Sequence, residues 1–178
     1  LQGSVNLVTA AGDVLTFISE GGGNWREESR RLAAAAAGVD FSARVTHNAN
    51  ESLANATRVF LALNTEVFDT DVIHDTVTNN SRLTCKTAGK YIIGGVVNFA
   101  ANATGQRLIG IRLNGTTYII DSSENAAGAG NSLFFTATLY SLAVNDYVEL
   151  GAYQDSGGAL NSNTSDFSPM FWMAKVLG

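Results

Sequence analysis

The side chains best suited to hold a ligand lie in one short stretch, FDTDVIHD. It brings together the carboxylates of Asp69, Asp71 and Asp75 with the imidazole of His74. Carboxylate oxygens suit Ca²⁺, but a calcium site needs six or more oxygen atoms. This spacing alone does not supply that many. The stretch is therefore either a calcium site or a solvated loop between two strands, and we expect no other cofactor.

Catalytic chemistry has few candidates. The chain has two histidines, and His47, in THNAN, has no obvious acid or nucleophile beside it in the sequence. A general base needs a partner within hydrogen-bonding reach. We therefore expect that the protein is not an enzyme.

The amino-acid composition and net charge limit the kinds of molecule that the protein can bind. Of the 178 residues, 46% are hydrophobic and only 15% are charged, and the net charge is −5. An acidic chain is not suited to nucleic acid or to an anionic membrane surface, and no apolar run reaches transmembrane length. The low charged share fits a protein that hides much of its surface in subunit contacts. The single Cys85 excludes an internal disulfide framework. The chain opens with Leu1 rather than Met, as expected of a fragment or a processed product.

The elements that position these residues are strands, and the longest is predicted at KTAGKYIIGGVVNFA, residues 86–100. Side chains on a strand alternate between two faces, and here neither face is polar. In an antiparallel sheet one face usually meets water. We therefore expect one face of this strand to pack on the core of the chain and the other on a second copy of the protein.

The chain divides into three parts. Residues 1–31 form a small β segment with two short strands, SVNLVT and DVLTFIS, and turns at 11–13 and 20–24. Residues 32–40, LAAAAAGVD, form a linker or a short helix. Residues 41–178 form the main all-β domain, in which Asn114–Gly115 is a strong hairpin signal. Its expected strands are Phe41–Thr46, Arg58–Leu63, Ser81–Lys86, Lys90–Ala100, Gln106–Leu113, Thr116–Asp121, Ser132–Ser141, Tyr147–Gln154 and Met170–Leu177.

Several segments of the main domain occur in a characteristic order: FSARV, RVFLALN, VFD, LTCKTAGKY, IRLNG, LYSLAVNDYVEL and DFSPMFWM. Together they resemble the C1q/TNF-like jelly roll over residues 41–178. Thr87, Asn145 and Pro169 depart from the residues that this family usually has at those places. The resemblance implies a ten-stranded jelly-roll sandwich that forms a compact homotrimer, with Tyr91 and the last strand near the threefold axis. On this basis the trimer interface is predicted at Tyr91, Ile93, Val97, Phe99 and Phe171.

The N-terminal segment GDVLTFISEGGGNWREESR is similar to short β modules of bacteriophage tail fibres and related virion proteins. The similarity is carried by Gly12, Asp13, Leu15, Phe17, Asn24, Trp25, Arg26, Glu27, Ser29 and Arg30. It implies an upstream fibre segment, a location on the virion, and a C-terminal head.

Two functions agree with this sequence. The first is a receptor-binding head, in which exposed loops on a rigid scaffold contact a host-surface glycan or protein. The second is a purely structural trimerisation or decoration module, and a cellular secreted C1q-like protein is a further alternative. The loops expected to bind the receptor are Asn102–Gln106, Ser122–Asn131 and Asp155–Thr164, with Asn102, Gln106, Ser123, Asn125, Asn131, Asp155, Asn161 and Asn163 as candidate contacts.

Overall fold

The computed structural model of the chain describes residues 14–31, 40–126, 128–165 and 168–176. The chain separates into two compact units, Leu1–Val39 and Asp40–Gly178. The predicted strand SVNLVT and nearly all of the predicted connector, residues 32–39, lie outside the described residues. Within the described residues no helix is long and apolar enough to span a membrane.

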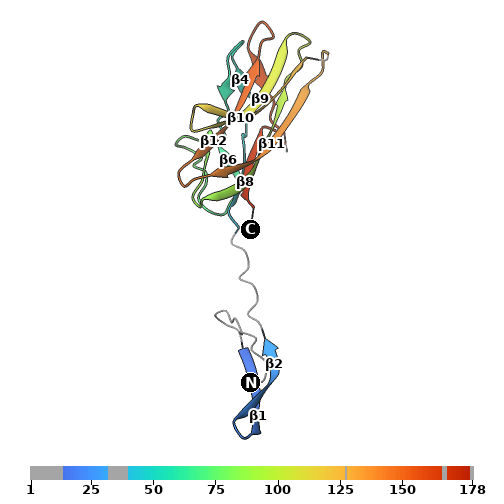
Figure 1. Cartoon of the computed structure of the whole chain (residues 1–178). Helices are drawn as coiled ribbons and strands as arrows, with labels where there is room; N and C mark the ends of the chain where they lie inside the picture. The colour runs from blue at the N-terminus through green and yellow to red at the C-terminus, as the bar shows by residue number, and fades with distance from the viewer. Residues whose placement is uncertain (1–13, 32–39, 127, 166–167, 177–178) are drawn as a thin grey trace. The chain divides into compact units, whose positions relative to one another are not determined.

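In the first unit, β1 (Val14–Gly21) pairs antiparallel with β2 (Asn24–Arg31) (Figure 1). Gly22 and Gly23 form the turn, and both have positive φ, which glycine adopts without strain. The large side chains of Val14 and Trp25 are more than half exposed. An isolated two-stranded hairpin is at best marginally stable in water.

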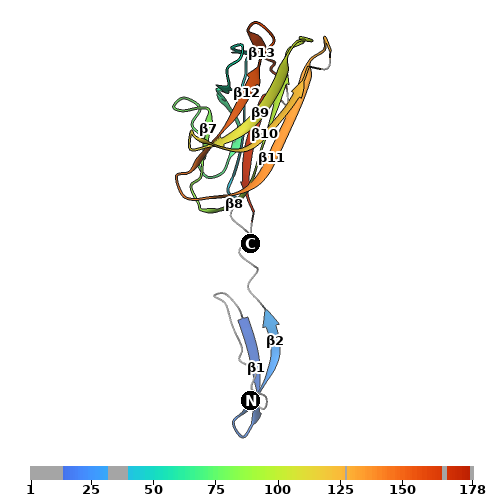
Figure 2. The same cartoon turned by 45° about the horizontal axis from the view of Figure 1, so that its top comes forward.

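The second unit is an all-β sandwich of two sheets, as predicted from the sequence (Figures 1 and 2). One sheet has the order β4-β13-β8-β14-β3-β6, and β11 also pairs with β8. The other has the order β10-β9-β12-β5, and β7 also pairs with β12. The first sheet comprises β3 (Ser42–Thr46), β4 (Glu51–Leu53), β6 (Thr65–Asp69), β8 (Gly89–Phe99), β11 (Ser132–Leu142), β13 (Leu160–Ser162) and β14 (Met170–Lys175). The second comprises β5 (Val59–Phe60), β7 (Arg82–Thr84), β9 (Gln106–Leu113), β10 (Thr117–Asn125) and β12 (Tyr147–Gln154).

The core lies between the two sheets and is built by alternate residues of the strands. Tyr91, Ile93, Val97 and Phe99 of β8 are fully buried and face it. At Gly95 a Cβ atom would come within 2.7 Å of the Leu150 side chain, so β8 and β12 of the second sheet are in close contact there. Cys85 is buried as well. The predicted central strand is therefore the strand around which the first sheet is assembled.

Most predicted strands of this unit occur within a few residues of their expected bounds. Gln106–Leu113 and Tyr147–Gln154 match completely. Three short strands, β4, β6 and β13, were not predicted from the sequence. Each depends on pairing with strands distant in the chain, because three to five residues carry too little alternation to be recognised locally.

The hairpin at Asn114–Gly115 is held by its own side chains as well as by its backbone. Both residues have positive φ, 49° and 73°, as a type I′ turn requires. The Asn114 amide also donates to Asp146 at 2.8 Å and accepts from the Tyr147 N–H at 2.9 Å. This side chain therefore joins two neighbouring turns at one end of the sandwich.

The loops of this unit gather at two opposite ends. β3 begins and β14 finishes at one of them, where Ala174 pairs with Ser42 and the Lys175 N–H donates to the Phe41 carbonyl. We call this the proximal end. The loops 54–58, 101–105 and 155–159 lie at the other, distal end (Figure 2).

Candidate functional site

The outer surface of the first sheet is mostly apolar across three successive rows of neighbouring residues. One row contains Phe135, Val96 and Met170. The next contains Ala137, Gly94, Trp172, Arg44 and Phe68, and the third contains Leu139, Ile92, Ala174 and Ser42. We call these rows, together with Leu133, the outer apolar face.

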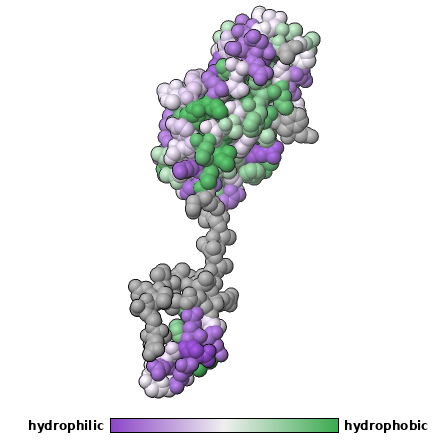
Figure 3. Space-filling model, turned by 45° about the vertical axis from the view of Figure 1, so that its right-hand side comes forward, coloured by the Kyte–Doolittle hydropathy of each residue, from purple (hydrophilic) through white to green (hydrophobic). Residues whose placement is uncertain are grey.

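Polar residues border this face at both ends of β8. Asn98 pairs with Leu133 beyond the first row, and Lys90 pairs with Ser141 beyond the third. Within the face, Phe135 is 62% exposed and Leu139 is 57% exposed. Figure 3 shows hydrophobic residues gathered in a connected area on the visible side of the unit. A contiguous apolar surface bordered by polar residues is typical of a protein interaction site.

The five residues predicted for the trimer interface do not lie on this face. Tyr91, Ile93, Val97, Phe99 and Phe171 are 0% exposed and pack in the core of the single chain. They therefore have no surface to offer to another copy. The outward side chains of the same strands are their immediate neighbours, among them Ile92, Val96 and Trp172. The five predicted interface residues therefore lie on the core-facing side of these strands, opposite the outer apolar face.

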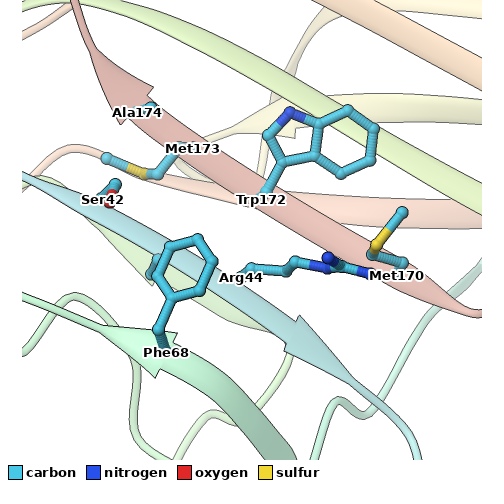
Figure 4. Close-up of a pocket in the computed structure, with 8 residues that line it drawn as sticks. Ser42, Arg44, Phe68, Met170, Trp172, Met173 and Ala174 are labelled. Atoms are coloured by element: carbon cyan, nitrogen blue, oxygen red, sulfur yellow. The ribbon is translucent and has the colours of Figure 1, made fainter. Parts of the chain in front are cut away.

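The outer apolar face contains a shallow hollow of about 380 Å³. Figure 4 shows the rings of Phe68 and Trp172 on either side of Arg44, whose guanidinium extends toward Met170. The Arg44 Nε is buried and has no hydrogen-bond partner within the described part of the chain. A buried guanidinium nitrogen without an acceptor is costly. The hollow is thus an apolar surface with one unsatisfied donor.

Gly94 determines how Trp172 lies on the sheet. A Cβ atom at Gly94 would overlap with the six-membered ring of the indole, so the ring can rest on the strand only because this residue is glycine. From there Trp172 stacks on Phe135, with centroids 6.0 Å apart and an interplanar angle of 27°.

We expect Gly94→Ala to force the indole of Trp172 away from β8, because the ring is rigid and cannot yield as a flexible side chain would. Overpacking of this kind costs about 1–3 kcal/mol, measurable as a lower urea midpoint at fixed protein concentration. Gly158→Ala is the control, because a Cβ atom there meets nothing within 4 Å. An equal loss in both variants would show that the contact with Trp172 is not the cause.

The predicted receptor-binding loops meet at the distal end, with some corrections. The Ala126 N–H donates to the Gly105 carbonyl, and Asp155 accepts from the Gln106 N–H, so the three predicted loops are directly joined. Ser123 and Asn125, however, belong to β10 rather than to a loop, and Asn161 belongs to β13. Four candidates lie outside the strands, Asn102, Asn131, Asp155 and Asn163, and Gln106 is the first residue of β9.

Two buried polar side chains, Arg107 and Gln154, donate hydrogen bonds to backbone carbonyls at the distal end. The Arg107 guanidinium donates to the carbonyls of Asn102, Thr104 and Gln106 at 2.9–3.1 Å. Burial lowers the pKa of Arg107, and the neighbouring Asp155 charge opposes that shift. The Gln154 amide donates to the carbonyls of Leu53 and Gly158. Neither side chain was singled out in the sequence, because each lies inside an otherwise ordinary strand.

The aspartate-rich stretch uses its carboxylates to hold its own backbone. Asp69 accepts from the N–H groups of Asp71, Ile73 and His74, and Asp75 accepts from those of Val77 and Thr78. These two backbone bonds lower the pKa of Asp75. Among the described residues, no group of three or more His, Cys, Asp or Glu is placed to hold a metal ion. Calcium binding stays a prediction that this geometry does not favour.

His47 lies close to an acidic side chain that was not predicted from the sequence. Its Nδ1 lies 3.5 Å from the carboxylate of Glu51, four residues further on. The same carboxylate accepts from the Ala62 N–H. Burial raises the pKa of Glu51, which the Ala62 bond and His47 partly oppose. The two side chains make no hydrogen bond at this distance, and the His47 Nδ1 is buried without a partner within the described residues.

No family model matches the sequence, and no curated protein matches it. Solved structures do resemble it. The Eiger TNF structure from S. frugiperda superimposes with a TM-score of 0.61 and 10% identity, over 78% of this chain and 93% of that one. The globular domain of zebrafish complement 1qA gives 0.56 and 11%, over 76% and 97% of the two chains. Murine APRIL gives 0.59 and 9%, over 77% and 99%. The larger unit of this chain therefore has the C1q/TNF-like jelly-roll fold.

Proposed function

We propose that the protein is a non-enzymatic binding module that assembles as a homotrimer through the outer apolar face. The observation that carries this proposal is the exposure of Ile92, Leu133, Phe135 and Leu139 on neighbouring positions of β8 and β11. Such a surface on a sheet of one chain is stabilised when another apolar surface covers it. A further copy of the chain meets that need, and the C1q/TNF-like fold supports a trimer in particular.

We further propose that the trimer is the C-terminal head of a virion fibre, as in a bacteriophage tail fibre, and that it binds a host-surface glycan or protein. The similarity of residues 12–30 to tail-fibre modules supports this placement. The distal loops support the binding role, because Arg107 and Gln154 hold them in one arrangement and a preorganised surface loses less entropy on binding. Three identical weak sites on one particle gain avidity without strong single contacts.

The first experiment is the mass of the full chain in solution by light scattering. We expect three times the 18.7 kDa of the single chain. A monomer at micromolar concentration would contradict the trimer, and with it the covered outer face.

The second experiment separates a receptor-binding head from a purely structural module. The labelled trimer is applied to a glycan array and to host cells, beside a variant carrying Asn102→Ala and Asn131→Ala at the distal end. Binding that the double variant weakens would support recognition by these loops. A trimer that binds neither array nor cells would favour the structural module.

A further inference from the structure

Besides the apolar hollow described above, the jelly-roll unit has a polar cavity. Its lining residues belong neither to the outer apolar face nor to the distal loops. It has a volume of about 530 Å³, within the range of ligand pockets. The loop residues 72–79, the strand β7 and the turn before β12 form its walls. The residues that line it are Val72, Ile73, His74, Asp75, Thr78, Asn79, Arg82, Thr84, Lys86, Asn145 and Tyr147.

The charges of this cavity differ from those of the chain as a whole. Two cations, Arg82 and Lys86, line it together with one carboxylate, Asp75, whereas the chain carries a net charge of −5. His74 is not available to a ligand, because its Nδ1 faces Glu66 and its Nε2 faces the Asn80 carbonyl, both at 3.1 Å. The cavity is thus a locally cationic site on an acidic protein.

Arg82 keeps free hydrogen-bond donors at this site. Its guanidinium stacks on the Tyr147 ring at 4.0 Å, and its Nε lies 3.5 Å from Glu149. That Nε is buried without a hydrogen bond. Within the described residues, its side chain contacts only this ring and this carboxylate.

Glu149 does not neutralise Arg82 fully, because it is shared. Its Oε2 accepts from the Nη2 of Arg112 at 2.6 Å and from the Nε at 3.1 Å, and its Oε1 accepts from Ser81 at 3.0 Å. One carboxylate therefore serves two guanidinium groups, and its closest contacts are with Arg112. This leaves Arg82 with charge and donors for a second acidic partner.

The remaining lining suits a ligand rich in hydroxyl groups. Thr78, Asn79, Thr84 and Asn145 offer hydroxyl and amide groups that both donate and accept. The Oδ1 of Asp75 accepts hydrogen bonds from two backbone N–H groups, and its Oδ2 can accept from a ligand hydroxyl. Arg and Lys bind carboxylates through charge-assisted hydrogen bonds.

From this arrangement we infer that the cavity binds an acidic saccharide, whose carboxylate pairs with Arg82 and Lys86 and whose hydroxyls meet the amide and hydroxyl side chains. The inference does not depend on the proposed trimer or on the distal loops.

The test is a titration of the ¹⁵N-labelled full chain with galacturonic acid, followed by NMR. Galactose is the matched probe, because it lacks only the carboxylate, and sodium sulfate is the probe for a bare anion. We expect galacturonic acid to shift the amide signals of residues 72–79, 82–86 and 145–147, with an affinity at least about tenfold above that of galactose. We expect Arg82→Met to remove this preference.

Arg58→Met is the control variant, because Arg58 also stacks on a tyrosine, Tyr118, and pairs with a carboxylate, Asp121, but does not line the cavity. It should bind as the unaltered chain does. The inference is overturned if galactose binds equally well, if Arg82→Met keeps the preference with a folded spectrum, or if galacturonic acid shifts no signals. It is also overturned if sulfate binds as tightly as galacturonic acid, since the site would then recognise only an anion.

Discussion

Leu139→Glu is expected to convert the proposed trimer into a folded monomer. Leu139 lies on β11 in the third row of the outer apolar face, 57% exposed in the single chain and paired with Ile92. In a monomer its substitution leaves a carboxylate in water at little cost. In the proposed trimer the same carboxylate would be buried without a partner, which costs about 3–5 kcal/mol at each contact. Light scattering would then report one third of the unaltered mass, and circular dichroism an unchanged β spectrum.

Val144→Glu is the matched control for this experiment. Val144 is 53% exposed, nearly as much as Leu139, but it lies in the turn between β11 and β12 and outside the outer apolar face. The control should keep the mass of the unaltered protein. If Leu139→Glu also keeps that mass, the outer apolar face is not the interface. If both variants dissociate, added charge alone is the cause.

The sequence predicted that the strand at residues 90–100 would be apolar on both faces. It did not show which face packs in the core of the single chain and which lies on its surface. Alternation places Ile93 and Ile92 on opposite sides of β8, and both are isoleucine, so no difference in polarity distinguishes the sides. In the structure, Leu150 of β12 packs against Gly95, so the Gly95 side of β8 faces the core. This contact joins residues 55 positions apart in the sequence, and so local periodicity could not reveal it.

The cavity beside Arg82 escaped prediction for a similar reason. Its walls come from a loop after β6, from β7 and from the turn before β12, which only the folded sheet brings together. The sequence did identify this loop as a candidate ligand site through Asp69 and Asp75, but the predicted ligand was Ca²⁺. The carboxylates instead bind backbone N–H groups of their own loop, and the residues that give the site its charge are two cations further along the chain.

Arg107→Met is expected to produce a large loss of stability in the jelly-roll unit. Arg107 is 0% exposed, and its three hydrogen bonds satisfy the carbonyls of the distal segment 102–106. Methionine fills much of the same space but donates nothing. A carbonyl left without a donor costs about 1–3 kcal/mol when it is fully buried. These three are only partly buried, so we expect the free energy of unfolding to fall by about 2–4 kcal/mol in total rather than by the full sum. That is a large part of the stability of a domain of this size.

Two comparisons distinguish this role from the loss of a positive charge. Arg107→Lys keeps the charge, but a single ammonium group lacks the planar fork that reaches separate acceptors, so it should restore only part of the lost stability. Arg58→Met should cost less than about 1 kcal/mol, because its partner Asp121 is 41% exposed in its side chain and can be solvated by water. Urea unfolding gives the free energies, and hydrogen exchange at residues 101–106 should rise in Arg107→Met before the sheets open. If exchange there is unchanged while stability falls, Arg107 supports the core rather than the distal loops, and the argument that those loops are preorganised for binding fails.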